Sequence, residues 1–308
     1  MRIREIGPIL KRRHGGPVRK LGIRLGTSCP HRSAHTGGCA FCADGPAREP
    51  PSLVDQLERG IARLGSEVAI VAYLQDHSAT LLSPRRLDRV LAEIGSHREV
   101  VAITVGTRPD CLPPGIIDVL ADHATRFDLL VELGLQTVSD RTLRFIHRRH
   151  DTWSFQTATR RLHQRGLRVC AHVILGLPSP AVGGIRPEGI EQAIATARQL
   201  AALEVEAVKV HNCHVLNNTP LADLLRCGLF YPPGAQGYVD RLIAFLEHLP
   251  RAVEVHRLVG EARRPALLAP AFTANKSRML QHIRTEMERR DTCQGRCSGG
   301  RAGALDSN

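Results

Sequence analysis

Three cysteines in one short segment are the strongest indication of a metal site in this chain. Cys29, Cys39 and Cys42 lie in the run CPHRSAHTGGCAFC. Thiolates are the usual ligands of iron–sulfur clusters, and a cubane of four irons normally takes four of them. Three cysteines would leave one iron open, and the amino and carboxylate groups of S-adenosylmethionine (SAM) can chelate such an iron. Phe41, directly before the last cysteine, is consistent with a [4Fe–4S] cluster that binds SAM.

The same segment allows a second interpretation, which is a structural zinc site. His31 and His35 lie between the first two cysteines, and three cysteines with one histidine form a common zinc tetrahedron. Spacing alone does not decide between the two metals. A zinc-bound, nucleic-acid-binding module without catalysis is therefore a second hypothesis for this segment.

The elements around the cysteines predict a parallel sheet. Short apolar runs alternate with longer amphipathic runs, which is typical of βα units. The expected strands are residues 21–25, 69–74, 100–105, 129–134, 168–175 and 207–211, and the expected helices are residues 52–64, 84–95, 114–122, 140–165 and 187–203. These repeats predict an α/β fold, a partial (β/α)6 TIM-like barrel over residues 21–226. Such barrels place their chemistry at the carboxyl ends of the strands.

The segments outside this barrel differ from it in composition. Residues 1–20 are a basic N-terminal segment, and residues 227–290 read as a C-terminal α/β extension with helices at 235–248 and 275–290 and a strand at 253–258. Residues 183–187 interrupt the pattern and predict a loop insertion. Residues 291–308 are polar and glycine-rich, which favours disorder.

Polar residues and glycines follow the expected strands, where a barrel enzyme holds its cofactor. Glutamine and arginine can hydrogen-bond ribose hydroxyls and the carboxylate of methionine, and glycines let the backbone approach an adenine closely. Glu132 is expected to be a buried carboxylate held by Arg108. Because they share successive strand ends of one barrel, these residues predict a binding site. The candidates for cofactor binding are Phe41 in the cysteine segment and, at the strand ends or on the following helix, Gln75, Thr107, Gln136, Arg148, His172 and Gly176.

The composition is that of a globular protein outside the membrane. The hydrophobic content of 43% and the charged content of 23% are typical, and no apolar run reaches the roughly 18 residues of a membrane helix. The first residues lack the apolar core of a signal peptide. Nine cysteines without such a signal favour reduced thiols and metal binding over disulfides. We therefore expect a cytoplasmic protein.

The net charge of +12 is concentrated at the two ends of the chain. Residues 1–24 contain eight Lys or Arg and one acid, residues 257–301 contain ten and four, and residues 25–256 contain 24 of each. A neutral body with two basic ends favours a phosphate-bearing partner. The chain has few aromatic residues on which bases could stack.

Six motifs, taken in order, resemble those of the YhcC-like radical SAM proteins. They are CPHRSAHTGGCAFC, TVGTRPDCLP, ELGLQTVSDRTLRFIHRRHD, HVILGLPSP, KVHNCHVLNNTPLA and ARRPALLAP. That family is similar in turn to the radical domain of the Elongator catalytic subunit and, more distantly, to oxygen-independent coproporphyrinogen oxidase. The resemblance covers residues 15–275.

The resemblance implies a [4Fe–4S] cluster on the three cysteines, with SAM on its open iron. In coproporphyrinogen oxidase, the glutamine of GLQ and the arginine twelve residues later contact the cofactor, and they match Gln136 and Arg148. The strand-five aspartate of that enzyme falls at His172, as in the Elongator-like pattern. Both relatives have a carboxylate residue directly before the TRPD-like segment, and the resemblance implies that it binds the ribose. This chain has Gly106 at that position, so we expect Thr107 to contact the ribose instead.

Together these observations predict a radical SAM enzyme with a barrel of that type and a C-terminal α/β extension. It would cleave SAM reductively to a 5′-deoxyadenosyl radical that abstracts hydrogen from a substrate, using electrons from a flavodoxin- or ferredoxin-like donor. The Elongator likeness and the basic ends favour RNA, in particular tRNA, as the substrate. A radical enzyme acting on a peptide or a small metabolite is the alternative.

Overall fold

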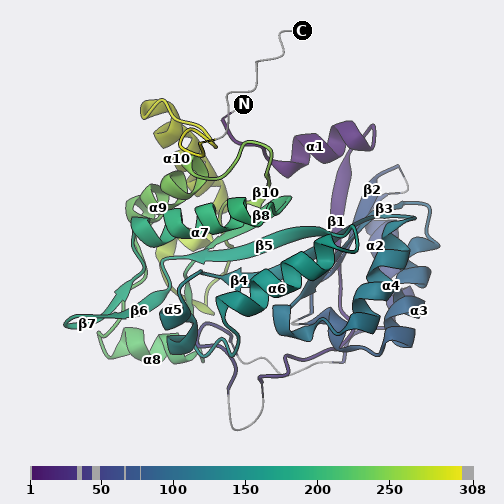
Figure 1. The fold of residues 1–308 in the computed structure, drawn as a ribbon, viewed down its shortest axis with the longest axis horizontal. Helices are drawn as coiled ribbons and strands as arrows, with labels where there is room; N and C mark the ends of the chain where they lie inside the picture. Colours follow the sequence, from purple (N-terminus) through teal and green to yellow (C-terminus); the bar gives the residue numbers. More distant parts are fainter. Residues whose placement is uncertain (1, 33–36, 44–48, 66, 77, 300–308) are drawn as a thin grey trace.

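A seven-stranded parallel sheet, curled into a partial barrel, is the centre of the molecule (Figure 1). The computed structural model describes residues 2–32, 37–43, 49–65, 67–76 and 78–299. The order of the strands is β1-β2-β3-β4-β5-β8-β10. Their bounds are β1 Val18–Ile23, β2 Ala69–Leu74, β3 Val100–Thr107, β4 Asp128–Gln136, β5 Arg168–Leu175, β8 Ala207–Asn212 and β10 Glu254–Arg257.

Helices cover the outer face of the sheet and bury its apolar side chains. Polar caps begin several of them: the Ser52 and Ser83 hydroxyls accept backbone N–H bonds at the starts of α2 and α3. The apolar core between helices and strands is continuous from β1 to α10. The helices are α2 Leu53–Leu64, α3 Pro84–Gly95, α4 Pro114–Ala124, α6 Thr152–His163, α7 Ile190–Ala202, α9 Ala235–Glu247 and α10 Lys276–Arg289.

The α/β fold and the partial barrel are confirmed, but the sheet has one strand more than the six expected. β10 comes from the C-terminal extension and pairs in parallel with β8, with Glu254 opposite Ala207. The extension therefore completes the barrel sheet. The periodicity suggested a strand at this place, but its pairing partner is not visible in the sequence.

The N-terminal segment is also part of the barrel. β1 begins at Val18, because residues 18–20 pair with residues 69–71 of β2. Helix α1 (Ile6–Arg13) packs at the amino end of the barrel, where Glu5 forms a bridge to Val255 of β10. Arg13 forms ion pairs with Asp128 and Glu254 across this end. The sequence placed the first strand at residues 21–25, three residues too late.

The helix expected over residues 140–165 is two helices, α5 (Asp140–Phe145) and α6. Between them, His147 and Arg149 have φ angles of 55° and 64°, a left-handed conformation that stops a helix. Asp151 caps α6 by accepting the Ser154 backbone N–H at 2.9 Å. This break places Arg148 in the site described below.

The insertion at residues 183–187 is half of a short hairpin, β6 (Pro178–Ala181) and β7 (Gly184–Pro187). A second small sheet pairs β9 (Val215–Leu216) with β11 (Leu267–Ala269). The remaining elements are α8 Pro220–Arg226, η1 Ala79–Leu81, η2 Pro109–Cys111 and η3 Ala271–Ala274. No helix in the described part of the chain is long and apolar enough to cross a membrane.

The expected disorder of the tail is wrong for residues 291–299. Gln294 is buried, and its amide donates hydrogen bonds to the carbonyls of Pro250 and Val253, each at 2.8 Å. Its side-chain oxygen accepts the Arg4 backbone N–H at 2.9 Å. A segment with few apolar residues can thus be ordered when its buried polar side chains form hydrogen bonds with backbone groups of the packed domain. Residues 300–308 lie outside the described part.

Candidate functional site

The cysteine segment follows β1 at the carboxyl end of the sheet, and neighbouring elements hold it there. The Ala40 backbone N–H donates to the Ile146 carbonyl at 2.9 Å, and the Ala40 carbonyl accepts the Leu221 N–H at 3.1 Å. Cys29 and Cys39 are buried, whereas Cys42 is half-buried. Phe41 packs on the apolar cluster formed mainly by α5, α8 and the end of β5. The backbone of Ala40, which follows Cys39, is therefore fixed to the end of α5 and to α8.

Arg148 connects this segment to β4. Its Nη1 atom lies 3.6 Å from Cys39 Sγ, and its Nη2 atom donates to the Gly134 carbonyl at 2.8 Å. The Arg148 carbonyl accepts a hydrogen bond from Arg108 at 2.9 Å. Both arginines are almost fully buried, with 6% and 1% of their surfaces exposed. The arginine that the sequence singled out thus reaches the cysteines through the break between α5 and α6.

The electrostatics of Cys39 and Cys42 favour a thiolate on Cys39. A hydrogen bond from Cys42 and, after the opposing cost of burial, the positive charge of Arg148 lower the pKa of Cys39 to about 5. The same hydrogen bond and burial raise the pKa of Cys42. A thiolate, rather than a thiol, is the form that binds metals.

The residues present fit an iron–sulfur cluster. Thiolate ligands bring several negative charges to one place, and two buried guanidinium groups lie beside them here. Arg108 Nη1 and Arg148 Nε are buried and have no hydrogen-bond partner within the described chain. Buried N–H groups usually have a partner, so an anionic group beside the cysteines would satisfy both.

A single zinc ion would need a tighter grouping of ligands than the described residues show. Zinc needs its ligand atoms within about 2.0–2.3 Å of one point, and no three His, Cys, Asp or Glu side chains in the described ranges are grouped to hold one ion. His31 Nε2 lies 2.9 Å from Asp110 Oδ2. His35 lies outside the described residues. A four-iron cluster attaches each cysteine to a different iron and does not require such close grouping.

Three of the predicted cofactor residues meet over Gly134. A Cβ atom at this position would lie 2.4 Å from Arg148 Nη2 and 2.8 Å from Gln136 Nε2, so a larger residue would displace both side chains. His172, the strand neighbour of Gly134, has its Nδ1 atom 3.0 Å from Gln136 Oε1. The structure therefore brings Gln136, Arg148 and His172 together beside Cys39.

Besides Phe41, which packs on the apolar cluster, the other three predicted cofactor residues are placed differently. Gln75 is exposed at the end of β2, where its amide lies over Gly22 of β1. The Thr107 hydroxyl is hydrogen-bonded with Ser78 and Thr80.

Gly176 has a φ of 81°, and a Cβ atom there would lie 2.5 Å from Pro233. Its lack of a side chain is therefore explained by packing and backbone conformation. The Thr107 hydroxyl, which we expected to contact the ribose because this chain has Gly106 where the relatives have a carboxylate, is already hydrogen-bonded to Ser78 and Thr80. The position of Thr107 and Gly176 after a predicted strand did not reveal these structural roles.

Below the carboxyl end, the barrel interior contains a buried ion pair. Lys209 Nζ lies 2.7 Å from Glu132 Oε1 and 2.8 Å from the Tyr73 hydroxyl. Burial opposes ionisation of Glu132, but Lys209 keeps the pKa of that carboxyl below its usual value. The expected partner, Arg108, is instead paired with Asp110 at 2.9 Å. The sequence identified the carboxylate but assigned it the wrong cation.

Sequence reasoning missed Asp76. Its carboxylate accepts the backbone N–H groups of Leu25 at 2.5 Å and Thr27 at 3.4 Å, in the segment that leads to Cys29. A carboxylate after a strand is a signal that could have been used. Its backbone partners are set by the fold, however, and a sequence does not show them.

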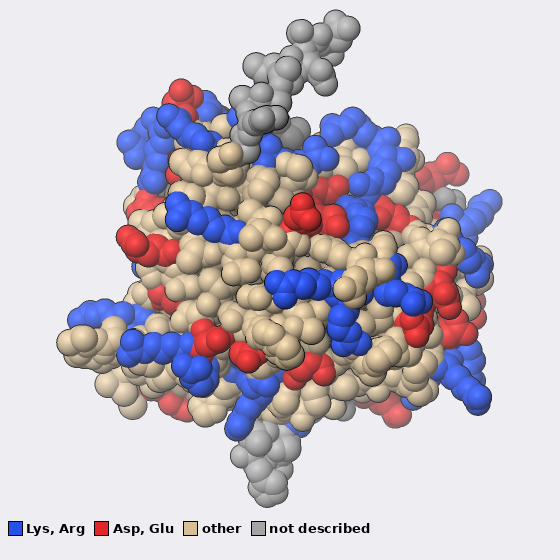
Figure 2. Space-filling view, viewed as in Figure 1, with Lys and Arg blue, Asp and Glu red and all other residues tan. Residues whose placement is uncertain are grey.

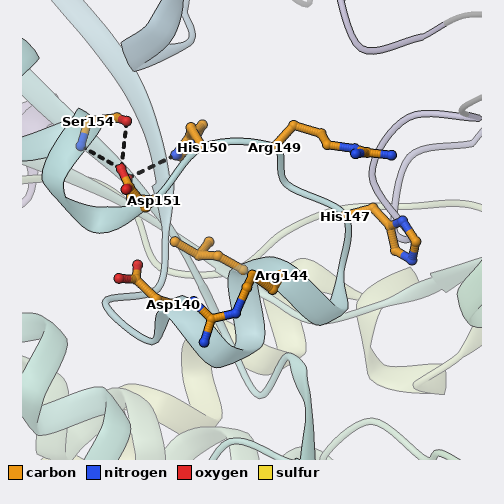
Figure 3. Close-up of a pocket in the computed structure, with 8 residues that line it drawn as sticks. Asp140, Arg144, His147, Arg149, His150, Asp151 and Ser154 are labelled. Atoms are coloured by element: carbon orange, nitrogen blue, oxygen red, sulfur yellow. Dashed lines mark hydrogen bonds between the residues drawn. The ribbon is translucent and has the colours of Figure 1, made fainter.

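A pocket of about 640 Å³ is lined by residues of α5, of the start of α6 and of the turn between them (Figure 3). Both of its carboxylates are occupied: Asp140 accepts the Thr152 N–H at 2.8 Å, and Asp151 accepts from Ser154. Arg144 and Arg149 form no side-chain hydrogen bond or ion pair within the described chain. The two aspartates and the two arginines balance in charge, but the guanidinium groups of Arg144 and Arg149 are the ones that face a ligand without a partner in the described chain. Its lining consists of Asp140, Leu143, Arg144, His147, Arg149, His150, Asp151 and Ser154.

Comparison with known proteins agrees with this geometry. The Radical SAM superfamily model matches residues 23–180, and the Radical_SAM C-terminal domain model matches residues 205–289. Protein YhcC of Escherichia coli (strain K12) is 32% identical over 282 residues, which are 89% of this chain and 88% of that protein. The chain therefore belongs to the radical SAM superfamily, in the family of YhcC.

Two more distant matches are proteins of larger size. The tRNA uridine(34) acetyltransferase of Methanocaldococcus jannaschii is 28% identical over 167 residues, which are 54% of this chain and 29% of that protein. The solved structure of archaeal Methanocaldococcus infernus Elp3, lacking residues 1–46, has a TM-score of 0.63 at 18% identity. That match covers 90% of this chain and 64% of the Elp3 chain, and it supports the fold alone.

Proposed function

We propose that this chain is a radical SAM enzyme in which Cys29, Cys39 and Cys42 bind a [4Fe–4S] cluster and Gln136, Arg148 and His172 hold SAM. The observation that carries this proposal is the position of Arg148. It contacts the Cys39 sulfur and the Gly134 carbonyl, while Gln136 lies over the same glycine. Membership of the superfamily supports the same cofactors.

When bound and reduced by one electron, these cofactors would supply a 5′-deoxyadenosyl radical that abstracts hydrogen from the substrate. The residues of the chain position and shield this chemistry. Arg108 and Arg148 offset the negative charge of the thiolates. His172 orients the Gln136 amide through the contact of 3.0 Å. The apolar cluster beneath Phe41 keeps water away from one side.

RNA is the substrate class that we propose, in particular tRNA. Lys and Arg gather over α1 and α10 at the amino end of the barrel (Figure 2), away from the cysteine segment. A ligand that contacts both this surface and the site must therefore be large. The similarity to a tRNA uridine(34) acetyltransferase supports the choice. A peptide or a small metabolite remains the alternative substrate and requires no contact with the basic ends.

Electrons would come from a flavodoxin- or ferredoxin-like donor that docks at the pocket between α5 and α6. Such carriers are acidic, and the available charged groups of this pocket, Arg144 and Arg149, are basic. Arg148, which follows His147 and precedes Arg149 of this pocket in the chain, contacts Cys39, so a donor here would be close to the cluster. All nine cysteines are free thiols, in keeping with a reducing compartment such as the cytoplasm.

The test is anaerobic reconstitution with iron and sulfide, followed by dithionite and SAM, with and without tRNA. We expect a cluster and 5′-deoxyadenosine from the wild-type protein, and neither from Cys39→Ala. The control is Cys227→Ala, which removes an exposed cysteine outside the site and should leave both unchanged. A fully loaded cluster that gives no 5′-deoxyadenosine in either condition would contradict the proposal. Zinc without iron or sulfide would support the non-catalytic hypothesis.

A further inference from the structure

Three histidines and one arginine form a cluster at the carboxyl ends of β5, β8 and β10. The rings of His172 and His211 lie 5.5 Å apart between centroids, and those of His211 and His214 lie 5.2 Å apart. Arg257 Nη1 lies 3.1 Å from His211 Nε2. The superfamily matches end at residue 180 and resume at residue 205, so the cluster combines side chains from both matched regions.

The fold holds His211 in a fixed position. A Cβ atom at Gly260 would lie 2.0 Å from the His211 ring, so the ring packs directly on the Gly260 backbone. The Gly260 N–H donates to the Asn212 side chain at 2.9 Å, and the Asn212 amide donates to Thr273 at 2.8 Å. The C-terminal extension therefore supports the position of the ring as well as providing Arg257.

The charge of this cluster is not balanced by the protein. Within the described chain, Arg257 forms no ion pair, and its one side-chain hydrogen bond is to His211. The nearby carboxylates are already used, since Glu132 pairs with Lys209 and Glu254 pairs with Arg168. Burial lowers the pKa of each of the three histidines, for His214 to about 4. The imidazoles are therefore neutral at physiological pH and leave one cation without a counterion.

A half-buried arginine without a carboxylate partner is costly unless a ligand supplies the negative charge. We propose that Arg257 and the neighbouring histidines bind an oxyanion of the substrate, either a phosphate or a carboxylate. The guanidinium presents several donors in a planar fork that suits both groups. His214 Nδ1 is buried and without a partner in the described chain, which makes it available as a second contact.

The assignment of this anion to the substrate rests on the proposed function, because it is His172 that connects the cluster to the SAM residue Gln136. The anion would then lie beside the cofactor, and it would set which atom of the substrate faces the radical. Under the proposed function, Arg148 would hold the carboxylate of SAM as well as lying beside Cys39. Arg148 and Arg257 would then serve the negative groups of the cofactor and of the substrate, respectively.

The test measures anion binding to the metal-free protein, which does not depend on radical chemistry. Thermal unfolding is followed at constant ionic strength while chloride is replaced by orthophosphate in one series and by acetate in another. We expect stabilisation of the wild-type protein, and an apparent affinity weaker by about tenfold or more in Arg257→Met. Arg257→Lys, which keeps the charge but loses the fork, should retain part of the response.

Arg278→Met is the matched control, because this arginine is exposed on the same extension and its side chain has no partner in the described residues. It should respond like the wild-type protein. A response to orthophosphate alone identifies a phosphate, and a response to acetate identifies a carboxylate. Equal anion affinity in the wild-type and Arg257→Met proteins would overturn the proposal. Competition between SAM and the anion in the reconstituted enzyme would also overturn it, by assigning the cluster to the cofactor.

Discussion

Arg148 is the residue on which the geometry of the candidate site depends most. It is buried, it contacts Cys39, and it donates to the Gly134 carbonyl. A positive charge this close to a sulfur stabilises the thiolate before any metal binds. The arginine would therefore prepare the metal-free protein for cluster assembly.

Replacement of Arg148 by Met should raise the pKa of Cys39 from its value of about 5. Loss of one hydrogen bond to a charged group corresponds to a rise of about 1–2 pH units. The Cys39 thiolate would then form at a higher pH than in the wild-type protein. The measurement is a pH titration of cysteine labelled with ¹³C at Cβ, followed by NMR on the metal-free protein.

Cys227 serves as the internal reference in that titration, because it is exposed and distant in sequence from the site. Its titration should be the same in both proteins. An unchanged midpoint for Cys39 in Arg148→Met would show that the arginine does not stabilise the thiolate.

Individual residues could be predicted from the sequence when their chemistry is rare. The three cysteines in fourteen positions pointed to the segment that Arg148 contacts at Cys39, and the GLQ glutamine and this arginine are brought together over Gly134. Thr107 and Gly176 could not be judged in this way. Their roles depend on Ser78, Thr80 and Pro233, which come from other elements.

At the scale of elements, the break between α5 and α6 is the feature that the sequence hid. Residues 146–151 contain no glycine or proline, the usual signals of a helix end. His147 and Arg149 nevertheless have left-handed φ angles, and Arg148 between them makes the tertiary contacts, with the Gly134 carbonyl and with Arg108. By contrast, the sequence located the seven strands within a few residues, because buried parallel strands are continuous apolar runs. The pairing of β10 with β8 could be seen only in the three-dimensional structure.

The same break forms the proposed docking surface for the electron donor. The double change Arg144→Glu and Arg149→Glu should slow cluster reduction by reduced flavodoxin by about tenfold or more, because it reverses the charge facing an acidic partner. Reduction by dithionite should be unchanged, since a small anion needs no docking surface. Stopped-flow absorbance of the reconstituted cluster measures both rates.

The control for this experiment is Lys11→Glu with Arg12→Glu, the same change in charge on α1 at the other end of the barrel. Its reduction rate with flavodoxin should match the wild-type rate. Equal slowing by both double variants would indicate an effect of net charge and would argue against docking at the pocket.

At the scale of the whole molecule, α1 from one basic end of the chain and α10 with residues 291–299 from the other lie together at the amino end of the barrel (Figure 1). The Gln294 backbone N–H donates to the Arg2 carbonyl at 2.9 Å, and Arg284 of α10 pairs with Glu5. The sequence showed that the ends are basic. It did not show that they meet, because α1, α10 and residues 291–299 are joined by contacts distant in sequence.

This combined surface predicts the salt dependence of RNA binding. Lys11→Glu with Arg12→Glu should weaken tRNA binding and reduce the slope of log K against log salt by about 1–2, since each lost phosphate contact removes about 0.7–0.9. The matched control is Arg85→Glu with Arg86→Glu on α3, in the neutral body of the protein. Filter binding at several salt concentrations gives both slopes. Weak RNA binding that does not depend on salt would favour a peptide or small metabolite.

The two edge strands of the sheet, β1 and β10, are not paired with each other, and Glu5 joins β10 only near the amino end. No ladder of hydrogen bonds therefore has to break for the carboxyl end to widen between these edges. A closed barrel offers its site to a ligand only at the carboxyl face, whereas an open curl leaves one side of the sheet unpaired as well. Under the proposal that RNA is the substrate, a nucleotide in the middle of a folded RNA would be able to approach from this side as well as from the face, without the RNA being cut.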